Sequence, residues 1–116
     1  MARFCKSMCP RYQAAVDIVG KRWTGMILYA LMSGPLRFNE LTERLEVVSD
    51  RMVSERLKEL ESEGIVERRV QPEPPVRVEY RLTEKGLALS SVIEAIGKWA
   101  ELWIQLDPAV LAAHSE

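Results

Sequence analysis

Residues that carry catalytic chemistry are scarce in this sequence. It has two cysteines, Cys5 and Cys9, and a single histidine, His114, close to the C-terminal end. No Cys/His or Ser/His/Asp arrangement is available, because no histidine base lies in the body of the chain. A glycine-rich loop of the kind that binds phosphate is also missing. We therefore expect a protein that is not an enzyme and needs no cofactor.

Long apolar runs are absent too, so no segment is expected to span a membrane. The first residues carry charge but lack the apolar stretch of a secretory signal. We therefore expect a cytoplasmic protein, with no membrane partner, whose thiols are normally reduced. Net charge is also nearly absent, because 16 basic and 17 acidic side chains give a formal charge of −1. Any nucleic-acid-binding surface must then be local. A chain of 116 residues fits a single domain, 1–116.

What the sequence does have is helical periodicity in its first half. Apolar spacing predicts a helix over about 10–19, with Pro10 in its first turn and Gly20 at its end. A second helix, capped by Thr24 and continuing through Met32, is apolar nearly all round, which predicts a buried central helix.

Two further helices follow the central one. A short helix is predicted over about 38–45. A fourth is capped by Ser49 or Asp50 and ended by Gly64, with one apolar face directed inward. The inward set of this fourth helix is Met52, Val53, Leu57 and Leu60.

The period then changes from helical to alternating. Residues 66–70 and 76–82 alternate apolar with polar side chains, which predicts a β-hairpin. Prolines at 72, 74 and 75 place its tip between the two runs, because proline is excluded from paired strands. Thr83 then caps a long last helix, about 83–106.

Two short helices joined by a tight turn and followed by a hairpin describe a winged helix-turn-helix. The fold class is therefore mostly α with a small β-hairpin. The helix-turn-helix occupies about 37–63 and the wing about 65–82. The first and last helices, about 10–19 and 83–106, form the predicted dimerisation region.

Three blocks carry a family resemblance: CPRYQAAVDIVGKRWTGMILYALMSGPLRFNEL, SERLKELESEGIVERRV and PPVRVEYRLTEKG. In this order, from about Cys9 to Trp103, they closely resemble the HxlR-type winged-helix regulators, a branch of the MarR-like group. The resemblance implies a homodimeric transcription factor that binds a palindromic operator in double-stranded DNA. It also implies an inducing signal, often an oxidant or electrophile sensed at the Cys-Pro cysteine, here Cys9. Two features depart from the family: the turn at 45–49 lacks glycine, and Cys5 is an extra cysteine.

The fourth helix is the predicted recognition helix. Burying its apolar face turns the opposite face outward, and the N-terminal half of such a helix reaches base edges in the major groove. Arg51 has the donor geometry for guanine, and Glu55 could accept from a cytosine amine or repel phosphate. An ordinary solvated helix face is the alternative. The predicted contacts on this helix are Ser49, Arg51, Ser54, Glu55 and Lys58.

Other basic residues surround this helix. Arg77, beside the wing tip, is expected to enter the minor groove. Arg68 and Arg69 are further wing candidates, but they equally fit charges that protect an edge strand from aggregation. Phosphate contacts are expected at helix N-termini, from Lys21, Arg22 and Arg37. Between residues 21 and 81 there are 11 basic and 11 acidic residues. Specific affinity would therefore depend on a dimer with half-sites about 34 Å apart.

The last helix carries an apolar stripe longer than a small domain needs for its own core. Exposed apolar surface of this kind usually marks a partner site, and tryptophan is a favoured interface anchor. We expect a homodimer with Ile96, Trp99 and Trp103 at its centre. The alternative is that both tryptophans belong to the core of the monomer.

Two other function classes stay open. A protein-interaction winged helix uses the same fold without DNA, and Asp50 and Glu55 on the fourth helix are compatible with it. A regulator switched by a small molecule held between the first and last helices is the second. The effector itself is unknown from the sequence.

The cysteine pair has several interpretations. Two thiols could supply half of a zinc site, but no second pair or nearby histidine supports one, so no metal is expected. A permanent disulfide does not fit a reducing compartment. Cys9 falls at the start of the first helix, where the helix dipole stabilises a thiolate. It could be a thiol sensor with Cys5 as resolving thiol, or an inert side chain that fills the dimer seam.

Overall fold

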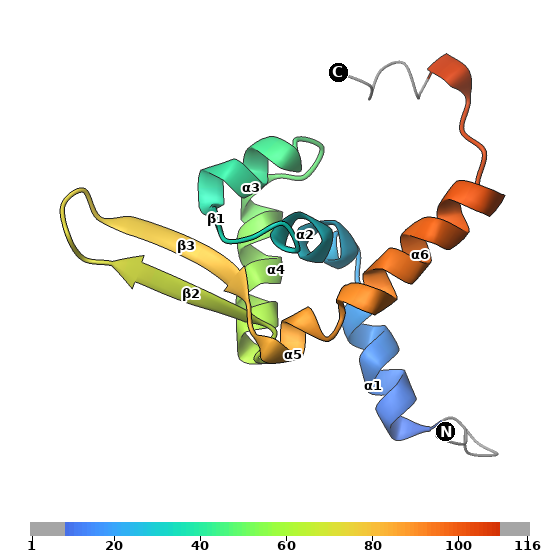
Figure 1. Cartoon of the computed structure of the whole chain (residues 1–116), viewed down its shortest axis with the longest axis horizontal. Coiled ribbons are helices and arrows are strands. Elements are labelled where there is room, and N and C mark those ends of the chain that lie inside the picture. The colour runs from blue at the N-terminus through green and yellow to red at the C-terminus, as the bar shows by residue number, and fades with distance from the viewer. Residues whose placement is uncertain (1–8, 110–116) are drawn as a thin grey trace.

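The computed structural model describes residues 9–109 and has the predicted winged helix-turn-helix architecture (Figure 1). A helical core carries a long β-hairpin on one side, and α1 and α6 project away from the core on the other. The elements are, in chain order, α1 Pro10–Val19, α2 Thr24–Leu31, β1 Leu36–Arg37, α3 Phe38–Arg44, α4 Asp50–Ser62, β2 Val66–Gln71, β3 Arg77–Leu82, α5 Glu84–Leu87 and α6 Ser90–Trp103.

The predicted boundaries of α1 and α4 are confirmed. Pro10 occupies the first turn of α1, and Gly20 follows its last residue. Of the two candidate caps of α4, Ser49 is the one used, because its hydroxyl accepts a 3.2 Å hydrogen bond from the Met52 amide. Gly64 follows α4 with φ of 75°, a left-handed conformation that glycine adopts without strain.

The predicted hairpin is confirmed, and it belongs to a sheet of three strands. The order is β1-β3-β2, and β2 pairs with β3 from Val66 opposite Leu82 to Gln71 opposite Arg77. Strand β1 adds Leu36 opposite Tyr80 on the other edge of β3. The sequence did not predict β1, because two residues are too few to show an alternating pattern.

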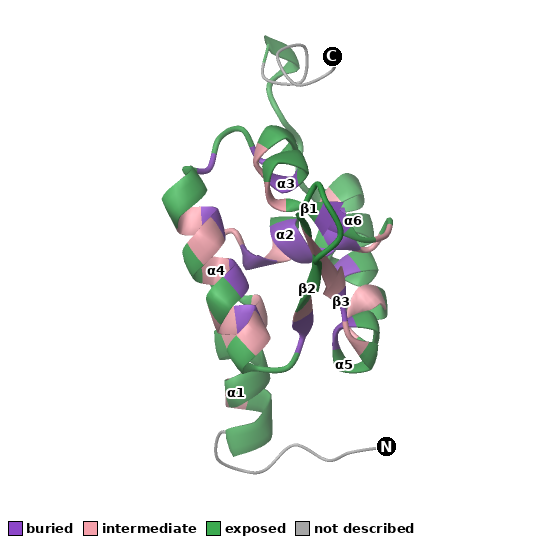
Figure 2. Ribbon diagram, turned by 90° about the vertical axis from the view of Figure 1, so that its left-hand side faces the viewer, coloured by how far each residue is buried: buried purple, intermediate pink, exposed green. Residues whose placement is uncertain are grey.

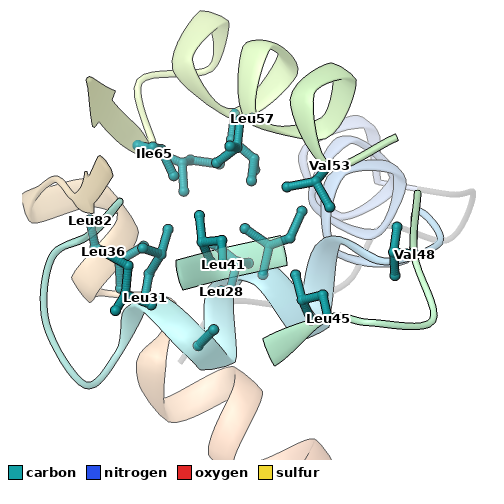
Figure 3. Close-up of a cluster of buried hydrophobic side chains, with 14 of the residues drawn as sticks. Leu28, Leu31, Leu36, Leu41, Leu45, Val48, Val53, Leu57, Ile65 and Leu82 are labelled. Carbon is teal, nitrogen blue, oxygen red and sulfur yellow. The ribbon is translucent and has the colours of Figure 1, made fainter. Parts of the chain in front are cut away.

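The core lies where α2, α3, α4 and the base of the hairpin meet (Figure 3). Leu28 of α2, Leu41 of α3 and Leu57 of α4 are at most 1% exposed and face one another there. Ile65 and Leu82 close the core at the hairpin. Each element contributes only one face, so the opposite face of α4 is left toward solvent.

Two predictions for α2, its cap and its burial on all sides, are wrong. The residue that precedes the helix as its cap is Trp23, with φ of 76°, and Thr24 is the first helical residue, only 2% exposed. The helix is also not buried all round, since Tyr29 is 67% exposed and Met26 is 41% exposed. Both features depend on tertiary packing that helical periodicity does not report.

The single last helix predicted over 83–106 is also wrong. Thr83 does act as a cap, accepting from the Gly86 amide at 3.2 Å, but it caps the short α5. The chain then turns and begins α6 at Ser90, which ends at Trp103 because Ile104 is extended. The start of this segment is anchored at Ile65, beside the base of the hairpin. The Thr83 hydroxyl also donates to the Ile65 carbonyl, and Gly86 lies so close to that carbonyl that a β-carbon would approach within 2.2 Å.

Candidate nucleic-acid interface

The orientation of α4 is set by its buried face. Val53, Leu57 and Leu60 are each at most 2% exposed, and Met52 is half-buried beside them. The buried row runs along one side of the helix, and the exposed residues cover the other (Figure 2). The inward set predicted from the sequence is therefore confirmed, and it determines which side chains α4 presents outward.

The predicted contacts of α4 lie on that outward side. Arg51, Glu55 and Lys58 are exposed, and Ser54 is half-buried. The Arg51 Nε atom lies 3.4 Å from a Glu55 carboxylate oxygen, but the Arg51 side chain is 89% exposed. An exposed pair of this kind contributes at most about 1 kcal/mol, so Arg51 separates from Glu55 at little cost.

Ser49 is exposed, but its hydroxyl already accepts the capping hydrogen bond of α4. The hydroxyl still has its proton to donate. Ser49 therefore holds the first turn of the helix and can donate outward at the same time.

On the wing, one acid holds two of the basic side chains. Glu67 accepts 2.9 Å hydrogen bonds from Arg69 and from Arg81. These bonds, the one from Arg69 first, hold the pKa of the Glu67 carboxyl below its ordinary value. Arg68 and Arg77 are exposed, and neither forms an ion pair with any other described residue. Of the three wing arginines predicted to contact DNA, the structure thus leaves two available and engages Arg69.

The junction between α1 and α2 contacts α4 through a cluster that sequence reasoning missed. This junction cluster consists of Lys21, Arg22, Arg56 and Glu59. The Lys21 ammonium donates to Glu59 at 2.8 Å, and the Arg56 guanidinium donates to Glu59 at 3.2 Å. Arg56 Nε also donates to the backbone carbonyl of Arg22 at 2.9 Å. The hydrogen bond from Lys21, opposed in part by desolvation, holds the pKa of the Glu59 carboxyl below its ordinary value.

The three predicted phosphate contacts therefore have different surroundings. Arg37 is exposed at the start of α3, where its backbone amide donates to the Glu40 carboxylate at 2.8 Å. Lys21 is held by Glu59, and the Arg22 guanidinium lies over the Trp23 ring at 4.4 Å from its centre. Of these three side chains, that of Arg37 forms no ion pair or ring contact with another described residue.

Cys9 is the residue that precedes α1. It is half-buried with an extended backbone, and its carbonyl accepts the first helical hydrogen bond, from the Gln13 amide at 2.9 Å. Cys5 lies outside the described residues. Within residues 9–109, no group of three His, Cys, Asp or Glu side chains is arranged to hold a metal ion.

The apolar stripe of α6 faces solvent in the single chain. Ile96, Trp99 and Trp103 are 53%, 59% and 71% exposed, so the alternative that both tryptophans belong to the monomer core is wrong. Leu102 on α6 and Tyr29 on α2 are exposed apolar residues that sequence reasoning had not singled out. A groove of about 1030 Å³ runs between α2 and α6, and Tyr29 and Ile96 line it.

This arrangement defines a winged helix-turn-helix protein. Its recognition helix α4 presents one face outward, and its wing carries several arginines. The chain matches the HxlR-like helix-turn-helix family over residues 18–108, and it belongs to that family. It is therefore a transcriptional regulator of the HxlR type. No helix within residues 9–109 has the length and apolar character needed to cross a bilayer.

Proteins with similar sequences are also named transcriptional regulators. The chain is 53% identical over 104 residues to the transcriptional regulator YvaP of Bacillus subtilis strain 168, covering 90% of this chain and 94% of YvaP. It is 52% identical over 95 residues to YodB of the same strain, covering 82% and 85% of the two chains. Both relatives are named as HTH-type transcriptional regulators.

Solved structures extend the comparison. The reduced form of YodB from B. subtilis matches with a TM-score of 0.77 and 49% identity, covering 85% of this chain and 97% of YodB. YodB has also been solved in a diamide-treated form and in a quinone-bound form. The oxidised form of the redox regulator HypR matches with a TM-score of 0.79 and 35% identity, covering 84% of this chain and all of HypR.

Proposed function

We propose that this regulator binds a palindromic DNA operator as a homodimer and reads it with the outward face of α4. The observation that carries the proposal is the division of α4 into a buried apolar row and an exposed row that contains Arg51 and Lys58. A helix held in this way can enter a major groove, whose width admits one helix. Arg51 then contacts a guanine, and Lys58, further along, contacts phosphate.

The wing and α3 complete the proposed contact surface. Arg77 is exposed on the hairpin, which extends well beyond the helical core (Figure 1). An arginine in this position suits a narrow minor groove, where the negative potential is strongest. Arg37 at the start of α3 is placed to contact a backbone phosphate.

The wing arginines give a matched test of DNA binding. Arg77→Ala should weaken binding to the operator by about 10-fold, because a free arginine in the minor groove is lost. Arg69→Ala should change binding by less than about 2-fold, since Glu67 already engages Arg69 in an exposed pair. The measurement is an electrophoretic mobility shift with DNA from upstream of the protein's own coding region, at low salt.

Two results would count against the proposal. Equal losses in Arg77→Ala and Arg69→Ala would mean that the wing acts only through general charge. No shift at low salt by a folded wild-type protein would favour the protein-interaction module instead.

We propose that the partner across the dimer covers the apolar stripe of α6. Trp99, Leu102 and Trp103 together expose more apolar surface than an isolated small domain usually leaves in water. Tyr12 and Val16 of α1, 51% and 44% exposed, are further apolar side chains that we assign to the interface. A pair of α6 helices flanked by α1 would place two copies of α4 side by side on the operator.

Trp103→Ala combined with Trp99→Ala should shift the protein from dimer to monomer at micromolar concentration, because both anchors of the interface are removed. Leu87→Ala is the control, since Leu87 is 56% exposed on α5 but lies outside the stripe. Sedimentation or light scattering measures the mass. A wild-type protein that is monomeric at micromolar concentration would overturn the dimer.

We propose that the Cys9 thiol switches this regulator. Cys9 immediately precedes α1, at the positive end of the helix dipole, which favours a thiolate. Support also comes from YodB, which has a diamide-treated and a quinone-bound form, and from HypR, named a redox regulator. Because α1 belongs to the proposed interface, a modified Cys9 would alter the spacing of the two recognition helices.

Cys9→Ser should stay bound to the operator after diamide or a quinone, whereas the wild type should dissociate. Cys5→Ser separates the two cysteines, since loss of a resolving thiol changes the product formed but leaves the first reaction at Cys9. Mobility shift and intact-protein mass together measure release and modification. Equal release of wild type and Cys9→Ser would end the thiol proposal and favour a small-molecule effector in the groove between α2 and α6.

A further inference from the structure

The junction cluster of Lys21, Arg22, Arg56 and Glu59 ties the recognition helix to a distant part of the chain. Its contacts join residues separated by 34 positions, from Arg56 to the Arg22 carbonyl, and by 38 positions, from Lys21 to Glu59. Arg56 is the most enclosed member, with its side chain only 13% exposed. None of the other contacts described for α4 links its polar surface to α1 or to the α1–α2 junction.

The position of this cluster on α4 is informative. At 3.6 residues per turn, Arg56 and Glu59 lie on a flank of the helix, between the buried row that contains Leu57 and the outward row that contains Arg51. The buried apolar row fixes which side of α4 faces outward, but because the hydrophobic effect is non-directional it constrains small rotations about the helix axis less tightly. Directional hydrogen bonds on the flank fix that rotation.

The far side of the cluster is held firmly. Trp23, the residue after Arg22, has φ of 76°, a left-handed conformation that is costly for a bulky side chain. Its ring packs against the core and lies 4.4 Å from the Arg22 guanidinium carbon. Such a conformation persists only where the surrounding structure determines it, so the Arg22 carbonyl is a fixed point for Arg56.

A groove lies beside the cluster, between α1 and α4. This groove of about 600 Å³ lies between the C-terminal half of α1 and the C-terminal half of α4, and both Lys21 and Glu59 line it. The two helices therefore do not pack closely here. Among the described residues, the hydrogen bonds and ion pairs between the α1–α2 junction and α4 are those of the junction cluster.

From this geometry we propose that Arg56 and Glu59 are positioning residues, which refine the rotation that the buried row gives α4 and so aim Arg51 and Ser54 at the base edges. The proposal rests on the DNA-binding function proposed above. It assigns Lys21 to Glu59 and not to a phosphate. Loss of the cluster then reduces discrimination between operator and other DNA, while the affinity for non-operator DNA is kept.

The test compares two variants that each remove one acidic charge from the same end of the recognition helix. Glu59→Gln breaks the cluster, whereas Glu63→Gln removes a carboxylate that forms no ion pair among the described residues. Each is titrated by fluorescence anisotropy with an operator duplex, selected by the wild-type protein from a random pool, and with a scrambled duplex. Lys21→Met, Lys21→Arg and the double variant Lys21→Met with Glu59→Gln complete the set.

We expect Glu59→Gln to bind the operator about 10-fold more weakly than Glu63→Gln, because a misaimed base contact loses its discrimination. Scrambled duplex should bind both variants within about 2-fold, since phosphate contacts are retained. The double variant should lose no more than Glu59→Gln alone, and Lys21→Arg should behave like wild type. The melting temperature should hardly move, because the Lys21–Glu59 pair is exposed and Arg56 keeps its hydrogen bond to the Arg22 carbonyl.

Three results would contradict the proposal in distinguishable ways. If Glu59→Gln and Glu63→Gln distinguish operator from scrambled duplex equally well, the cluster does not position α4. If Lys21→Met weakens both duplexes and lowers the salt dependence by about one ion, Lys21 is a phosphate contact instead. If the wild-type protein itself does not distinguish operator from scrambled DNA, the proposed function fails together with this inference.

Discussion

The rest of the structure depends on the burial of one row of side chains on α4. Val53, Leu57 and Leu60 fill the centre of the core against α2 and α3, as Figure 3 shows for the first two. Their burial fixes which side of α4 faces outward, and that side includes Arg51, Glu55 and Lys58. Exchanging the inward and outward rows would put charged side chains into the core, at a cost far above the stability of a small domain.

Charge on the outward surface is limited by internal pairing. Glu67 engages Arg69 and Arg81, and Glu59 engages Lys21 and Arg56. These pairs contribute little to stability, but they hold cations that would otherwise attract any DNA. Arg77 forms no ion pair with another described residue, and the exposed pair of Arg51 with Glu55 separates at little cost. A surface of this kind favours sequence discrimination over general affinity, and it suits a dimer that doubles a small set of contacts.

The elements that sequence reasoning predicted are those whose signals are local. The spacing of Val53, Leu57 and Leu60 predicts the inward face of α4, and proline at the hairpin tip predicts where the wing turns. What failed depends on distant contacts. The helical pattern that begins at Thr83 shows neither that Gly86 packs against the Ile65 carbonyl nor that the helix is interrupted before Ser90.

In the candidate site, too, some residues can be placed from local sequence patterns and others cannot. The outward residues of α4 follow from periodicity alone. That Lys21 pairs with Glu59, or that Arg56 binds the Arg22 carbonyl, does not, because partners 34 or more positions apart leave no periodic signal. For Trp99 and Trp103, the sequence shows only that the last helix has more apolar residues than a small core needs. It does not show which of them stay exposed. Within residues 9–109, Trp99 and Trp103 both remain more than half exposed.

The most direct test of the whole account is the base preference of Arg51→Ala. Selection from random duplexes, followed by sequencing, gives the preference at every operator position for the wild type and the variant. The account predicts that preference relaxes at one symmetrical position in each half-site, by a factor of about 10, with the remaining positions unchanged. A uniform loss of affinity with every preference retained would contradict it, because Arg51 would then be a phosphate contact and α4 would not read the sequence.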